Sequence, residues 1–230
     1  MKPDAAIFDI DGTLLPMSLE RMLIACMLRH KLVSWGMLVK RIASLALKPG
    51  GKKRFLINKF YLQGLDVERV ENLLEQGCWE EIRGRFFPTM LNIAGLFREA
   101  DVPIILLSGT IDVMAKRVAA MMDADLVISS RLEVVDGKFT GRIQGIYPYR
   151  EGKVQLAEQI ISASGWDWAR VWAFGDSGSD IPLLTRVGNP VAVNPSKELR
   201  KLARRNGYLI IDAGPRFWLP FRQRNRAAKP

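Results

Sequence analysis

Apolar and polar positions alternate along most of the chain with spacings that predict strands and helices in turn. Short apolar runs predict strands at residues 5–10, 103–107, 126–129, 171–174, 190–193 and 208–211. Amphipathic stretches predict helices at residues 89–100, 111–122, 151–164, 181–186 and 197–206. Strands interleaved with helices indicate an α/β protein with a doubly wound, mostly parallel, Rossmann-like sheet.

Two segments depart from this order. Residues 131–146 alternate around Asp136 and Gly137, which predicts a β-hairpin that we interpret as an embellishment of the sheet. Apolar segments punctuated by basic residues predict helices at 22–28, 32–39, 42–47, 54–62 and, capped by Asp66, 67–76. We therefore expect a small helical domain inserted after the first strand.

Composition narrows the class of protein. With 230 residues, 48% hydrophobic and 25% charged, the chain suits one globular α/β domain with a substantial insertion. Four acids interrupt the first 20 residues, so we expect no cleaved signal and a cytoplasmic location. Uncharged runs within residues 22–47 are too short for the roughly 20 residues that cross a bilayer.

The cysteines and the single histidine suggest no separate chemistry. Cys26 and Cys78 are far apart and in no metal-ligand spacing, which predicts free thiols in a reducing compartment. His30 lies between Arg29 and Lys31, which predicts a surface position. Catalysis by histidine and a histidine-rich metal site are therefore excluded.

The net charge of +10 is concentrated in two segments. The tail after Asp212 holds five basic residues and no acid, and residues 21–65 hold ten and no acid, which leaves about −5 for the rest. The ten are Arg21, Arg29, Lys31, Lys40, Arg41, Lys48, Lys52, Lys53, Arg54 and Lys59. Trp35, Met37 and the leucines of this segment either form the core of the insertion or give a cationic, apolar surface for lipid-like substrates or an anionic membrane.

Candidate chemistry lies where the predicted strands end. Asp9 and Asp11 leave the first strand on the same side, and Asp176 and Asp180 follow another strand. Such carboxylates could bind Mg²⁺, with Asp9 and Asp176 as hard oxygen ligands and the Asp11 backbone carbonyl completing the set. The alternative for the first pair is an ordinary acidic turn, because Asp-Gly is a common turn dipeptide.

Two further candidates carry a hydroxyl and a positive charge. Ser108 ends an apolar strand and is followed by Gly109 and a predicted helix, a natural position for binding an anion or for capping the helix. Lys153 lies at the start of an amphipathic stretch and is either a site residue or a solvated surface lysine.

The four motifs together, FDIDGTL, SGT, Lys153 and GDSGSD, resemble those of haloacid dehalogenase superfamily phosphatases. The place of the insertion and the hairpin are similar to the phosphoserine phosphatase-like branch. The resemblance implies a catalytic core at 1–14 and 88–212 and a helical cap at 15–87, which leaves the basic tail at 213–230. It covers the core but does not extend into the cap.

The resemblance also implies a role for each motif residue. Asp9 matches the nucleophile that forms an aspartyl phosphate, and Asp11 matches the general acid and base. The phosphoryl oxygens would be held by Gly12, Ser108, Gly109 and Lys153. Mg²⁺ would be held by Asp9, Asp11 and Asp176, with Asp180 orienting the metal ligands and Lys153.

Three departures from the branch leave the substrate open. Ser18 stands where phosphoserine phosphatases carry a glutamate, Arg54 is only a nearby candidate for their substrate-binding arginine, and Ser179 replaces their usual asparagine. We expect a Mg²⁺-dependent phosphomonoesterase for an apolar or lipid-like phosphate, or else a phosphoserine or small-metabolite phosphatase. A nucleic-acid-binding protein with a phosphatase-like core is the alternative of another class, but no recognition motif or aromatic platform supports it.

Overall fold

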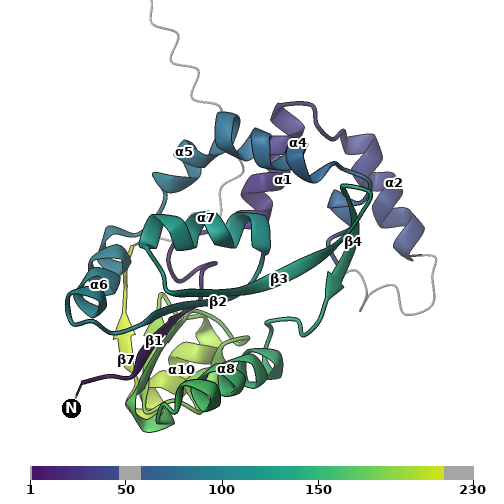
Figure 1. The fold of residues 1–230 in the computed structure, drawn as a ribbon. Helices are drawn as coiled ribbons and strands as arrows, with labels where there is room; N and C mark the ends of the chain where they lie inside the picture. Colours follow the sequence, from purple (N-terminus) through teal and green to yellow (C-terminus); the bar gives the residue numbers. More distant parts are fainter. Residues whose placement is uncertain (1, 47–57, 215–230) are drawn as a thin grey trace, which may run out of the picture.

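A computed structural model describes residues 2–46 and 58–214 and confirms the α/β class (Figure 1). Its seven-stranded sheet has the order β4-β3-β2-β1-β5-β6-β7, and only β4 is antiparallel to its neighbour. The strands are β1 (Ala5–Phe8), β2 (Ile104–Ile111), β3 (Leu126–Val135), β4 (Lys138–Gln144), β5 (Val171–Gly175), β6 (Asn189–Val193) and β7 (Leu209–Ile211).

Helices cover both faces of the sheet, because β1 is apolar on both sides. Ala6 and Phe8 belong to one buried cluster, and Ala5 and Ile7 belong to a second cluster on the opposite face. Helices α6 (Pro88–Glu99) and α7 (Asp112–Met122) contribute to the first cluster. Helices α8 (Glu151–Ser164), α9 (Ile181–Leu184) and α10 (Lys197–Asn206) contribute to the second cluster. Figure 1 shows α6 and α7 on one side of the sheet and α8 and α10 on the other.

The inserted segment is helical and packs beside the α7 face of the sheet (Figure 1). Its described elements are α1 (Leu19–Arg29), α2 (Trp35–Ala46), the 3₁₀ turn η1 (Phe60–Leu62), α4 (Val67–Leu73), the π-helical turn η2 (Leu74–Cys78) and α5 (Trp79–Arg83). The chain enters and leaves this cap at one place, because the Phe87 N–H donates to the Leu14 carbonyl at 2.8 Å. The predicted domain boundaries stay a prediction.

Several predicted cap helices differ from the structure. The prediction of two helices, at 32–39 and 42–47, was wrong, because the structure has a single helix here, α2, which begins at Trp35. Of the helix predicted at 54–62, residues 54–57 lie outside the described chain, and only the short turn Phe60–Leu62 follows. Asp66 precedes α4, but its side chain makes no capping hydrogen bond.

The helix predicted at 67–76 continues past its expected end as η2 and α5. Leu74, Cys78 and Ile82 are all buried at intervals of four residues. The helical segment therefore keeps one apolar face against the cap core across the π-helical turn.

The hairpin is more than the predicted embellishment, because it joins the core to the cap. Strand β3 pairs with β2 as far as Ser130 and then continues outward with β4. The β4 side of the hairpin bonds to the cap: the Lys59 N–H donates to Gly141 at 2.8 Å and the Gly64 N–H donates to Phe139 at 2.7 Å. In return, the Phe139 N–H donates to the Leu65 carbonyl at 2.9 Å.

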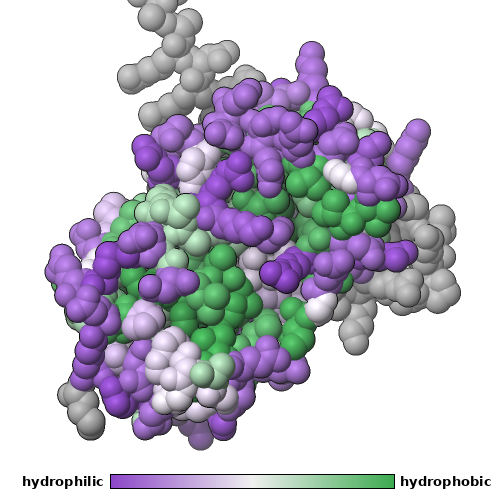
Figure 2. All heavy atoms as spheres, in the orientation of Figure 1, coloured by the Kyte–Doolittle hydropathy of each residue, from purple (hydrophilic) through white to green (hydrophobic). Residues whose placement is uncertain are grey.

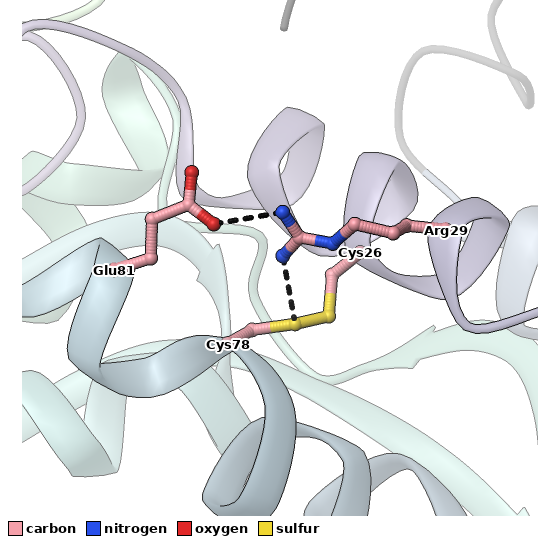
Figure 3. Close-up of a disulfide and its surroundings, with 4 residues drawn as sticks. All are labelled: Cys26, Arg29, Cys78 and Glu81. Atoms are coloured by element: carbon pink, nitrogen blue, oxygen red, sulfur yellow. Dashed lines mark hydrogen bonds and ion pairs between the residues drawn. A yellow bond between two sulfur atoms is a disulfide. The ribbon is translucent and has the colours of Figure 1, made fainter. Parts of the chain in front are cut away.

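The prediction of free thiols was wrong, because Cys26 of α1 and Cys78 of η2 form a disulfide (Figure 3). The two cysteines are 52 residues apart in sequence, and only the packing of α1 against η2 brings them together. Arg29 donates to Glu81 at 2.9 Å and to the Cys78 sulfur at 3.8 Å. His30 is exposed, as predicted.

Candidate active site

Most of the predicted site residues lie on three neighbouring strands or directly after them, toward the carboxyl ends of these strands. Asp9 follows β1, Asp176 follows β5, and Ser108 lies within β2. Carboxylate oxygens of Asp9, Asp176 and Asp180 lie within 4.8 Å of one another, and all three residues are buried. The structure therefore brings together acids from two segments that are more than 160 residues apart.

Lys153 is a buried member of this cluster rather than a solvated surface lysine. Its Nζ donates to Asp9 Oδ1 at 2.6 Å and to Asp180 Oδ1 at 2.5 Å, and the residue is 2% exposed. Burial alone would lower the pKa of Lys153, but the carboxylates of Asp180 and Asp9 raise it above the ordinary value. The ammonium group therefore stays charged and holds the two acids in place.

Asp9 has one oxygen toward Lys153 and the other toward Thr13, whose hydroxyl donates to Oδ2 at 3.3 Å. Burial raises the pKa of Asp9 to about 7, although the charge of Lys153 acts in the opposite direction. With three carboxylates and one lysine, the cluster has more negative charge than Lys153 can balance when all three acids are ionised.

Asp11 has a different set of hydrogen-bond partners from Asp9. Its Oδ1 accepts from the Leu19 N–H at 2.9 Å, and its Oδ2 accepts from the Thr110 hydroxyl at 2.9 Å. Burial raises the pKa of Asp11 to about 6, against the lowering effect of the Leu19 hydrogen bond. A carboxyl group with such a pKa can both give and take a proton near neutral pH.

Only glycine fits at position 12, because the loop after β1 passes close to Asp176. Its φ is +84°, and a Cβ at this position would lie 2.3 Å from Asp176 Oδ2. Any side chain would therefore collide with one of the candidate metal ligands.

Ser108 is buried at the end of the apolar part of β2, but it does not cap a helix. Strand β2 continues to Ile111, and α7 begins at Asp112. The helix predicted to begin at 111 directly after Ser-Gly-Thr therefore begins one residue later, and Ser108 Oγ accepts from the Thr110 N–H at 3.3 Å. Gly109 adjoins Ser108, and a Cβ on it would lie 3.3 Å from the Tyr147 hydroxyl.

Asp180 organises the loop after β5. Its Oδ2 accepts from the backbone N–H groups of Asp176 and Ser177 and from the Ser177 hydroxyl, each at 3.1 Å. Its other oxygen accepts from Lys153. Ser179 is within 2.8 Å of the Ser177 hydroxyl, so the residue in place of asparagine still belongs to the hydrogen-bonded loop.

Sequence reasoning missed a second polar group beside Asp11. Lys59 forms a salt bridge of 2.5 Å with Glu20 and lies 5.4 Å from the centre of the Tyr147 ring. Burial would lower the pKa of Lys59, but Glu20 and Tyr147 raise it. Glu20 directly follows the residue that donates to Asp11, and its charge contributes to the raised pKa of Asp11. No sequence signal pairs Glu20 with Lys59, which come from separate cap segments.

Thr13 and Thr110 were also overlooked, although a signal for each was present. Thr13 is the last residue of the DxDxT pattern, and Thr110 lies two positions after Ser108 on the same strand, where side chains share a face. Each hydroxyl donates to one of the first two aspartates.

The donor set suits Mg²⁺. Asp9, Asp176 and Asp180 are carboxylates, and Mg²⁺ prefers oxygen ligands of this kind. The raised pKa of Asp9 reflects negative charge held away from water, and a divalent cation would compensate it. The carboxylate of Asp11 is directed to Leu19 and Thr110 instead, so only its backbone could contribute.

A sequence profile of the haloacid dehalogenase-like hydrolases matches residues 6–185, and the chain belongs to this family. Phosphoserine phosphatase SerB1 of Mycobacterium tuberculosis H37Rv is 29% identical over 66% of this chain and 49% of its own length. Histidinol-phosphatase of Neisseria meningitidis serogroup C is 30% identical over 67% of this chain and 72% of its own length. The Inhibition of morphological differentiation protein of Streptomyces azureus is 27% identical over 71% of this chain and 58% of its own length.

Solved structures show the same fold. A Bordetella pertussis Tohama I protein of unknown function superposes with a TM-score of 0.78 at 24% identity, covering 93% of this chain and all of that one. A substrate-bound phosphoserine phosphatase superposes with a TM-score of 0.65 at 21% identity, covering 92% of this chain and 93% of that one. The chain spans only 49–58% of the length of the first six curated relatives.

Proposed function

We propose that this chain is a Mg²⁺-dependent phosphomonoester hydrolase that works through an aspartyl phosphate on Asp9. The observation that carries the proposal is the separation of the first two aspartates. Asp9 lies in the buried carboxylate cluster with Lys153, whereas Asp11 is held apart by Leu19 and Thr110. One carboxylate is therefore arranged as a nucleophile and the other as a proton carrier.

The chain's own residues supply both steps. In the first, an oxygen of Asp9 forms a bond to phosphorus while the bond to the leaving oxygen breaks, and that oxygen takes the proton of Asp11. In the second, water attacks the phosphorus of the aspartyl phosphate and gives a proton to Asp11, which releases phosphate and restores Asp9. Thr110 and the Leu19 amide keep the Asp11 oxygens in position throughout.

The remaining motif residues would hold the phosphoryl group. Lys153 and Ser108 can contact its oxygens, and the backbones at Gly12 and Gly109 can approach closely because neither carries a side chain. Bound Mg²⁺, held by Asp9, Asp176 and the Asp11 carbonyl, would neutralise the charge repulsion between carboxylate and phosphate. Asp180 would act through Lys153 and the loop after β5.

Two substrate classes are compatible with the cap. Its cationic, apolar composition supports an apolar or lipid-like phosphate. A small polar metabolite is supported by a specific contact set, the Glu20–Lys59 ion pair beside Asp11 and the Tyr147 hydroxyl next to Gly109. Because these groups are charged or polar, they favour a leaving group that is polar next to its phosphate. Relatives named phosphoserine phosphatase and histidinol-phosphatase point in the same direction. Among the residues that the structure describes, no such contact set supports the nucleic-acid alternative.

The first experiment measures hydrolysis of an aryl phosphate by the purified chain with Mg²⁺, with excess chelator, and after Mg²⁺ is restored. We expect activity to disappear on chelation and to return with the metal. Asp9→Asn is the inactive control, because it removes the nucleophile. Full turnover in excess chelator would contradict the proposal.

The second experiment compares phosphomonoesters that differ in the leaving group. A panel of phosphoserine, histidinol phosphate, lysophospholipid and prenyl phosphates is assayed with wild type, Glu20→Gln and Lys59→Met. If the Glu20–Lys59 ion pair contacts the leaving group, both substitutions should lower kcat/KM for the polar substrates much more than for the aryl phosphate. Equal losses on every substrate would limit the pair to a structural role.

A further inference from the structure

The outer face of α2 is the most unusual surface of the cap. We define it by three exposed residues of the helix, Trp35, Val39 and Lys40, together with exposed Lys31 in the turn that precedes α2. Trp35 is 71% exposed and Val39 is 60% exposed, and no large apolar side chain in the described part of the chain is more exposed than Trp35. The cap therefore presents an apolar pair to solvent beside two cations.

The core of the cap does not need this face. Helix α2 already buries Leu38 and packs Met37 against the main apolar cluster. Figure 2 shows apolar and hydrophilic side chains lying next to one another over the end of the cap where α2 lies. Two large apolar side chains next to one another on the solvent side of a helix whose other side is packed are suited to a contact with something outside the chain.

Lys31 and Lys40 give the face a positive charge and favour an anionic partner. Along the chain, residues 21–65 contain ten basic residues and no acid. Among described residues, Glu81 pairs with Arg29 and Glu20 pairs with Lys59, but no ion pair in the described ranges involves Lys31 or Lys40. The face therefore keeps its positive charge, and an anionic surface would complement it.

We propose that the α2 face docks on an anionic phospholipid surface. Trp is favoured at the boundary between lipid headgroups and hydrocarbon, where its ring is partly buried, and lysines beside it attract anionic headgroups. A nucleic acid suits the face less well, because single-stranded binding uses several stacked aromatic rings and Trp35 is the one aromatic ring on this face. In the described part of the chain no helix is long and apolar enough to span a membrane, so the contact is peripheral.

Docking is independent of hydrolysis, so the two proposals can fail separately. The full chain is sedimented with vesicles of phosphatidylserine and phosphatidylcholine and with vesicles of phosphatidylcholine alone, over a series of salt concentrations. We expect binding only to the anionic vesicles and a steep decline with salt, because the screening length falls from about 10 Å at 0.1 M to about 3 Å at 1 M.

Two variants test the face itself. Lys31→Gln with Lys40→Gln should weaken vesicle binding by about fivefold for each lysine removed. The matched control, Lys116→Gln with Lys201→Gln, removes two exposed lysines from α7 and α10 and should bind like wild type. Equal binding by wild type and the first variant, or equal loss in both variants, would overturn the proposal.

A direct readout uses Trp35. Brominated lipid quenches tryptophan that reaches the bilayer, so quenching should occur in wild type and largely disappear in Trp35→Phe. Leu96→Ser removes another apolar side chain that is 64% exposed, on α6, and should leave the quenching unchanged. Thermal melting confirms that each variant is folded. Unchanged quenching in Trp35→Phe, or binding to single-stranded RNA without preference for anionic vesicles, would refute docking on lipid.

Discussion

Replacing Lys153 by methionine tests the electrostatic account of the site most directly. Met has nearly the same length, so the change removes the charge while leaving little empty volume. The Lys153 ammonium lies 2.6 Å from Asp9 and 2.5 Å from Asp180, with all three side chains buried. Removing one partner from such a buried group costs about 3–5 kcal/mol, which for a domain of this size is about 6–20 °C in Tm.

This cost should depend on pH. The pKa of Asp9 in the folded protein is about 7, above its usual value, so Asp9 favours the folded state at low pH and loses that contribution as pH rises toward 7. Without Lys153 its carboxylate is harder to ionise still, and the loss extends to higher pH. At pH 5 Asp9 already carries a proton and does not need the lysine. We therefore expect roughly the full penalty at pH 8 and about half of it at pH 5.

The assay is denaturation by urea, monitored by circular dichroism, of metal-free wild type and variant at both pH values. Lys116→Met is the matched control, because Lys116 is exposed and its contact with Asp112 is 3.5 Å long. It should change stability by less than about 1 kcal/mol and equally at both pH values. A Lys153→Met penalty that is the same at pH 5 and pH 8 would refute the role assigned to its charge.

Three further predictions concern the nucleophile, the first loop and the cap. Asp9→Asn should form no phosphorylated enzyme with a good leaving group, whereas Asp11→Asn should form it slowly and accumulate it; acid-quench trapping distinguishes them, and a phosphoryl group on another residue would overturn the assignment. Gly12→Ala should reduce Mg²⁺ affinity at least tenfold by calorimetry, because its Cβ would displace a carboxylate; unchanged affinity would contradict this. Reducing the Cys26–Cys78 disulfide should lower stability by about 2–4 kcal/mol in urea, with Cys26→Ser insensitive to the reductant.

Much of the core could be predicted from sequence because its elements are determined locally. The helix predicted at 151–164 and the helix predicted at 197–206 have the predicted bounds in the structure. Both are amphipathic and end at Gly165 and Gly207, which adopt the left-handed conformation that stops a helix. The motif aspartates could also be located, because parallel strands place their carboxyl ends at one edge of the sheet.

The cap could be predicted far less well because its contacts are between distant segments. Cys26 and Cys78 carry no signal of pairing, and only the packing of α1 on η2 joins them. Glu20 and Lys59 likewise carry no signal of pairing, because α2 lies between them in the sequence. Such pairings depend on tertiary structure, which neither spacing nor hydrophobic periodicity encodes.

The bonding of the hairpin to the cap limits how the cap can open. In the described chain, backbone–backbone hydrogen bonds join the cap to the core at two places: the paired linkers at Leu14 and Phe87, and the β3–β4 hairpin. Arg117 of α7 also donates to the Glu71 carbonyl of α4 at 3.1 Å. If the hairpin moves with the cap, its hydrogen bonds to Lys59 and Gly64 stay intact, and bending is confined to β3 beyond Ser130, where pairing with β2 ends. Rotation of the cap about the line through these two places would keep those backbone hydrogen bonds. Sideways sliding over the carboxylates would require backbone hydrogen bonds to break.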